Sequence, residues 1–158
     1  MALKFPYKKF PQNPNEAFPD HKQVQRPVIP ITIRYKKKEI DYLALIDSGV
    51  DFCIFHGEVG QYLGVDIKSG RKLEFFGITG QKEAAYFHEI TICIGGHNKK
   101  CYCGFSEFDN SKLPYGILGQ KSFFDSFRVM MDYTKNRIEL STAENRVVDV
   151  ETKKSGST

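Results

Sequence analysis

The sequence predicts a single small domain built mainly from β-strands. Apolar and polar residues alternate over short runs, and the runs end at clusters of glycine, asparagine or other turn-forming residues. The clearest run covers residues 28–35, and residues 40–46 follow as its hairpin partner across a lysine-rich turn. A chain of 158 residues has about the length of one domain, so one modest core is expected.

The other elements follow in order with short turns between them. The expected strands after the first hairpin are residues 52–55, 72–76, 83–87, 88–94, 100–105, 127–132 and 137–140. Two short segments fit helical turns, residues 58–63, which end at Gly64, and residues 120–126. The sequence therefore predicts a mostly β, barrel-like domain with one or two short helices.

Both ends of the chain differ from this central part. Residues 1–23 contain four prolines, a spacing that excludes a regular helix or a central strand. Aromatic side chains give this Pro-rich N-terminal arm a means of docking on a surface. Residues 144–158 are polar and are expected to form a flexible C-terminal tail. The expected organisation is thus an arm over 1–23, a domain over 24–143 and a tail over 144–158.

Composition narrows the classes of function. No apolar run approaches the roughly 20 residues of a membrane span, and the first residues, MALKFPYKKFPQ, lack the apolar stretch of a secretory signal. A cytoplasmic location is therefore expected, with the four cysteines as free thiols. The net charge is only +4, and the densest basic run, residues 35–38, is interpreted as a solvated turn. Neither nucleic acid nor a membrane is expected as a partner.

One acidic residue stands out because it directly follows an apolar strand. The run Leu45-Ile46 leads into Asp47-Ser48-Gly49, which places a carboxylate at the end of a largely buried strand. Burial of a carboxylate is costly unless the charge is used or paired. By itself the triplet is also typical of a turn that aspartate caps. Much later, residues 115–119 give a second apolar pair followed by glycine.

Five landmarks in this order resemble the retropepsin-like (retroviral-type) aspartic proteases over about residues 25–127. They are Gln25-Arg26-Pro27-Val28, the turn from Leu45 to Asp51, Gly77-Ile78-Thr79-Gly80 at the place of the flap tip, residues 90–99 after the flap, and Ile117-Leu118-Gly119-Gln120. The ending, residues 127–140, is more similar to the bacterial branch of the family than to the viral one.

The resemblance implies an aspartic endopeptidase with the retropepsin-like acid protease fold. The chain has a single Asp-Ser-Gly, so the implied site forms across a homodimer, with one catalytic Asp47 from each subunit. Two carboxylates held close share a proton, and the pair activates a water without a cofactor or metal. Ser48 and Gly49 would support the site, with Ser48 bonded across the dimer axis. The implied contacts to an extended peptide or protein substrate are Val50, Asp51, Gly77, Ile78, Thr79, Gly80 and Ile117. Asp51 would also pair with Arg26 of the other subunit, so that Arg26, Ser48 and Asp51 lie at the dimer interface.

Other readings of these residues stay open at this point. Val50 departs from the Ala, Ser or Thr that usually follows the triplet, and its two extra methyl groups relative to Ala narrow the pocket. A catalytically weak or inactive dimerisation or peptide-binding module is therefore the alternative function. A zinc site is a further alternative, with Cys93, His97, Cys101 and Cys103 as its ligands. Their spacing lacks the usual C-x2-4-C pair, so free thiols are the favoured interpretation.

Overall fold

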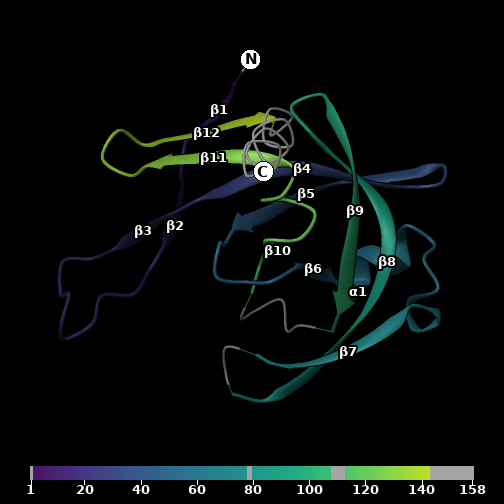
Figure 1. Ribbon diagram of the computed structural model, residues 1–158. Helices are drawn as coiled ribbons and strands as arrows, with labels where there is room; N and C mark the ends of the chain where they lie inside the picture. The colour runs from purple at the N-terminus through teal and green to yellow at the C-terminus, as the bar shows by residue number, and fades with distance from the viewer. Residues whose placement is uncertain (1, 78–79, 108–112, 143–158) are drawn as a thin grey trace, which may run out of the picture.

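The computed structural model of the chain describes residues 2–77, 80–107 and 113–142 (Figure 1). Its strands are β1 (Leu3–Phe5), β2 (Lys8–Pro11), β3 (Gln23–Arg26), β4 (Val28–Tyr35), β5 (Lys38–Ile46), β6 (Cys53–His56), β7 (Arg71–Phe76), β8 (Lys82–Ile94), β9 (His97–Ser106), β10 (Gly116–Leu118), β11 (Phe127–Asp132) and β12 (Arg137–Thr142). This part also contains the helix α1 (Gly57–Tyr62) and a 3-10 turn, η1 (Ile67–Ser69). None of its helices has the length and apolar character that a membrane crossing requires.

Six strands close into a barrel in the order β4-β5-β10-β6-β9-β8 (Figure 1). The ring closes because β4 pairs with β5 along one edge and with β8 along the other. Strand β7 is added outside the ring through its hairpin with β8. The mostly β, barrel-like fold predicted from the sequence is thereby confirmed.

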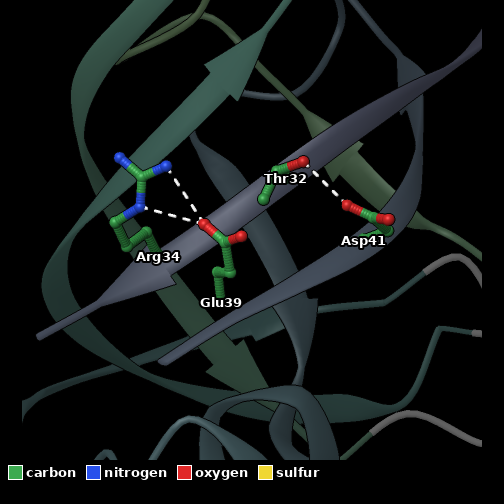
Figure 2. Close-up of polar contacts among 4 residues, drawn as sticks. All are labelled: Thr32, Arg34, Glu39 and Asp41. Carbon is green, nitrogen blue, oxygen red and sulfur yellow. Dashed lines mark hydrogen bonds and ion pairs between the residues drawn. The ribbon is translucent and has the colours of Figure 1, made fainter. Parts of the chain in front are cut away.

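Alternation along the β4–β5 hairpin explains why it forms. Ile29, Ile31 and Ile33 point inward and are buried, and each buries enough apolar area for about 1.5–3 kcal/mol. On the outer face, the Thr32 hydroxyl donates to Asp41 at 2.8 Å, and Arg34 donates twice to Glu39 at 3.1 Å (Figure 2). Exposed pairs of this kind contribute about 0–1 kcal/mol. The inward isoleucines therefore dominate the stability of the hairpin.

The N-terminal arm contributes strands of its own. Strand β1 pairs with β12 at the edge of the three-stranded sheet β1-β12-β11, and β2 and β3 form a separate two-stranded ribbon. Leu3 and Phe5 pack against the core, and the buried Tyr7 donates its N–H to Asn136 Oδ1 at 2.9 Å. The arm thus docks as its aromatic residues indicated. The division of the chain at residues 23 and 143 stays a prediction, and the tail over 144–158 lies outside the described residues.

Two expectations about the elements are wrong. Residues 83–87 and 88–94 form one continuous strand, β8, because no residue between them breaks the pairing with β9. Residues 120–126 do not form a helix. Ser122 has φ +78°, and the N–H groups of Phe124 and Asp125 reach back to carbonyls five residues earlier. This irregular turn brings the fully buried Phe123 into the core, which outweighs the local preference for a helix.

Candidate active site

Asp47 lies on a tight turn directly after β5. Its backbone N–H donates to the carbonyl oxygen of Leu118 at 3.0 Å, and its carboxylate oxygen Oδ1 accepts the N–H of Gly49, also at 3.0 Å. The N–H of Val50 reaches the Asp47 carbonyl at 3.4 Å, which closes the turn. The side chain is half-buried. The turn therefore fixes the carboxylate at a set place on the barrel while leaving it accessible.

Strand β10 places the second landmark of the site beside this turn. It lies between β5, to which it is parallel, and β6, to which it is antiparallel, and its Ile117 pairs with Leu45 and Ile54 (Figure 1). Gly119 follows β10 at the point where the chain comes closest to residues 50–52, just after the Asp47 turn. A Cβ there would lie 2.6 Å from the Val50 carbonyl oxygen and still closer to that of Phe52. Only glycine fits at this position, because both obstacles are backbone atoms.

Gln120 ties the two segments together more directly. Its N–H donates to the Val50 carbonyl at 2.8 Å, and its side-chain amide donates to the Ser48 carbonyl at 2.9 Å. The next N–H, from Lys121, donates to the Asp51 carbonyl at 2.9 Å. No role was predicted for Gln120 from the sequence. Its signal was the polar side chain that directly follows the apolar-apolar-Gly segment.

The predicted site residues are only partly brought together. Ser48, Gly49 and Asp51 are exposed on the Asp47 turn, Val50 is half-buried there, and Ile117 is buried alongside it in β10. Arg26 lies in β3, where it is exposed and opposite Lys8. Within the described part of this chain, no ion pair or hydrogen bond joins Arg26 to Asp51. Their proposed pairing would need a second subunit.

The β7–β8 hairpin contains the segment where the flap tip is predicted. Near its tip the Gly77 N–H donates to the Gln81 carbonyl, and the Gly80 N–H donates back to the Gly77 carbonyl, both at 2.9 Å. Gly80 has φ +77°, a conformation that favours glycine. The other two residues of the predicted tip, Ile78 and Thr79, lie outside the described residues.

An aromatic cluster that the sequence analysis missed joins this hairpin to the Asp47 turn. The ring of Phe52 lies edge-on to Phe75 of β7, with centroids 5.9 Å apart, and to Phe87 of β8 at 5.2 Å. Phe87 in turn contacts Tyr102 at 5.3 Å. Both strands of the hairpin, near its tip at Phe75 and at its base at Phe87, are therefore packed against the residue that directly follows Asp51.

All four cysteines are free, and three of them lie in the core. Cys53, Cys101 and Cys103 are fully buried, whereas the other two members of the zinc alternative, His97 and Cys93, are exposed and half-buried. Contact with the Cys101 thiol, together with burial, raises the pKa of the Cys53 thiol. In residues 2–77, 80–107 and 113–142, no group of three or more His, Cys, Asp or Glu side chains could hold a metal ion.

Comparison with known proteins connects this arrangement to one fold. No family model matches the chain, and no curated protein matches it by sequence. Among solved structures, it is similar to a retropepsin-like aspartic protease from Rickettsia conorii, at 18% identity over 84% of this chain and 98% of that one, with a TM-score of 0.52. It also matches the EIAV protease in complex with the inhibitor HBY-793 (20% identity, 60% and 82% covered, TM-score 0.46) and the simian foamy virus (mac) protease (16%, 58% and 88%, TM-score 0.35).

The similarity to the Rickettsia structure extends over nearly all of that protein. It shows that this chain has the retropepsin-like aspartic protease fold, which confirms the resemblance found in the sequence. Asp47, at the end of β5 and beside β10, occupies the turn on which that resemblance rested.

Proposed function

We propose that the chain is an aspartic endopeptidase whose active site forms across a homodimer, with one Asp47 from each subunit. The observation that carries the proposal is the anchored Asp47 turn, bonded through its N–H to Leu118 and through its carboxylate to Gly49. Hydrolysis of a peptide bond by an aspartic protease requires two carboxyl groups. The whole sequence contains only one Asp-Ser-Gly triplet to supply them. A two-fold dimer supplies the second carboxylate from an identical chain.

The chemistry follows from the sharing of one proton between two close carboxylates. Two carboxyl groups at short range cannot both ionise, because their negative charges would repel each other. One of them is therefore protonated and the other is ionised. The ionised carboxylate takes a proton from a water molecule, and the protonated one donates a hydrogen bond to the peptide carbonyl. The activated water attacks the carbonyl carbon directly. The C–N bond of the resulting tetrahedral intermediate then breaks, and the carboxyl group that took the proton from the water gives it to the leaving amine nitrogen. Ser48, exposed on the same turn, bonds across the dimer axis in this arrangement and holds the two turns together.

The substrate class is an extended peptide or protein segment. The β7–β8 hairpin closes over it with Gly77, Ile78, Thr79 and Gly80 at the tip, and closure excludes bulk solvent while the one reacting water stays beside the carboxylates. Backbone hydrogen bonds hold the peptide in extended form, as in strand addition. Val50, Asp51 and Ile117 contact the peptide from below. The free thiols suit a reducing, cytoplasmic compartment for this activity.

One observation favours a second candidate function, a peptide-binding or dimerisation module without activity. Val50 is larger than the usual occupant of its position, and it is half-buried beside the carboxylate. Its carbonyl accepts the Gln120 N–H, so its backbone cannot shift without losing that bond. The extra methyl groups therefore have to be accommodated within the pocket.

Incubation of the purified protein with a diverse peptide library at several pH values separates the two functions. The proposal expects cleavage that an active-site-directed aspartic protease inhibitor blocks and that EDTA leaves unchanged. Asp47→Asn is the matched control, since it preserves the size of the side chain but cannot ionise. Peptide binding without any cleavage would instead identify the module.

A further inference from the structure

A buried polar pair near the site has no part in the proposed chemistry. His56, at the end of β6, is only 5% exposed, and Tyr42 reaches it from β5. The Tyr42 hydroxyl contacts His56 Nδ1 and also accepts the backbone N–H of His56 at 3.2 Å. On its other side, His56 Nε2 lies 2.7 Å from the carbonyl oxygen of Leu113. The pair thus links two barrel strands to the segment before β10.

The partners fix the direction of each hydrogen bond. A carbonyl oxygen can only accept, so His56 Nε2 carries the proton that it donates to Leu113. In a neutral imidazole the other nitrogen, Nδ1, then accepts the Tyr42 hydroxyl proton. Burial raises the pKa of Tyr42, which keeps that proton on its oxygen. The Leu113 carbonyl therefore sets the tautomer of His56, and the Tyr42 hydroxyl supports that tautomer by donating to Nδ1.

The segment held in this way leads into the strand that anchors Asp47. Residues 113–116 enter β10, which has only three residues, and Leu118 at its end accepts the Asp47 N–H. Tyr42 also covers Gly116 so closely that a Cβ there would lie 2.5 Å from Tyr42 Cε1. The segment is consequently fixed at its end by the Asp47 turn and at its start by His56 and Tyr42.

We infer that His56 and Tyr42 are positioning residues, which hold residues 113–116 in place beside the candidate active site and so set how tightly a peptide binds. The inference rests on the proposed function for its kinetic part. Loss of the His56 donor frees the start of the segment but leaves the bonds from Asp47 to Leu118 and from Gln120 to Ser48. The Michaelis constant KM should therefore change, and kcat should not.

Two substitutions of His56 separate positioning from packing. The amide nitrogen of glutamine reaches the place of Nε2, whereas that of asparagine reaches only the place of Nδ1. His56→Gln should keep KM within about twofold of wild type, since it can still donate to Leu113. His56→Asn should raise KM by about three- to tenfold, the effect of one neutral hydrogen bond, with kcat within about twofold. His97→Asn, at the exposed start of β9, is the control and should change neither.

Tyr42→Phe tests whether the tyrosine acts through the histidine. The single variant should also raise KM, because His56 Nδ1 loses the hydroxyl that bonds to it and holds the ring against Leu113. The double variant with His56→Asn should raise KM no more than His56→Asn alone, since the two residues serve one contact. Independent, multiplying effects of the two substitutions would overturn the inference for Tyr42.

Hydrogen exchange gives a readout that does not need activity. The amides of Leu113, Tyr115 and Gly116 should exchange faster in His56→Asn than in wild type and at the wild-type rate in His56→Gln, at a temperature where all variants are folded. Unchanged exchange in His56→Asn, or equal KM values for both variants, would overturn the inference. A wild-type protein without peptidase activity but with the expected exchange pattern would reject the proposed function and retain the positioning role.

Discussion

The β4–β5 hairpin and the Asp47 turn adjoin each other in the chain but are stabilised in different ways. The hairpin is made of neighbours, since Val28 to Tyr35 pair with Leu45 to Lys38 across a short turn. The Asp47 turn is held by bonds from residues 118–121, and the bond from Gln120 to Ser48 joins groups 72 residues apart in the sequence. Local alternation is thus enough for the hairpin, whereas the candidate site depends on contacts across the whole barrel.

The largest expected effect concerns the carboxylate of Asp47 itself. Asp47→Asn should abolish peptidase activity and still fold, because its side chain is half-buried and asparagine has the same size. Mixed in equal amounts with wild type and allowed to exchange subunits, it should leave about a quarter of the dimers fully wild type. Activity should then fall to about a quarter of that of the same total amount of wild-type protein. A fall to one half would mean that each chain carries a complete site.

Two substitutions, one beside the Asp47 turn and one in the β4–β5 hairpin, compare how much each region contributes to the free energy of unfolding. Gly119→Ala places a methyl group against the carbonyls of Val50 and Phe52 and should cost about 3 kcal/mol of unfolding free energy. Ile33→Val in the hairpin removes one methyl group from the core and should cost about 1 kcal/mol. Denaturant unfolding measures both values. Equal costs would show that the close approach at Gly119 relaxes easily.

A smaller effect is expected from Arg26, which lies just before the hairpin. If it pairs with Asp51 of a second subunit, Arg26→Ala removes both symmetry-related ion pairs of the dimer and should raise the dimer dissociation constant at least about tenfold. Lys37→Ala, in the hairpin turn, is the control and should leave dimerisation unchanged. Sedimentation over a range of protein concentrations measures both constants. An unaltered constant for Arg26→Ala would place this residue on a solvated surface.

The smallest effect concerns another locally built turn, the one after β11. Bonds from the Lys135 N–H at 3.1 Å and the Thr134 hydroxyl at 2.9 Å lower the pKa of Asp132 below its ordinary value. The Asp132 carboxylate therefore binds a proton more readily in the unfolded chain than in the folded one. Its contribution to the stability of the fold is present near neutral pH and is lost as the pH falls through the pKa of Asp132 in the folded state. The difference in melting temperature between wild type and Asp132→Asn should therefore shrink from about pH 6 to about pH 3. A difference in melting temperature that stays constant with pH would mean that the charge of Asp132 does not stabilise the turn.

The same contrast explains which features the sequence could predict. Alternation predicted β4 and β5, and the position of Asp47 after an apolar strand predicted an acid on a turn. The helix expected over residues 120–126 failed because Phe123 is drawn into the core, which no local pattern reveals. The amide of Gln120 was missed for a related reason. Its partner, the Ser48 carbonyl, becomes a neighbour only when β10 pairs with β5.

The parallel pairing of β10 with β5 also bears on the order in which the molecule folds. Parallel neighbours cannot be joined by a tight turn, and here the chain between them includes β6, α1, η1 and β7–β9. The entropy of closing so long a loop has to be met before the contacts between Leu118 and Asp47 can compensate for it. Hairpins such as β4–β5 form without that cost. The Asp47 turn is therefore expected to be among the last parts of the domain to order, so that a growing chain on the ribosome has no ordered candidate site until almost all of the barrel has emerged.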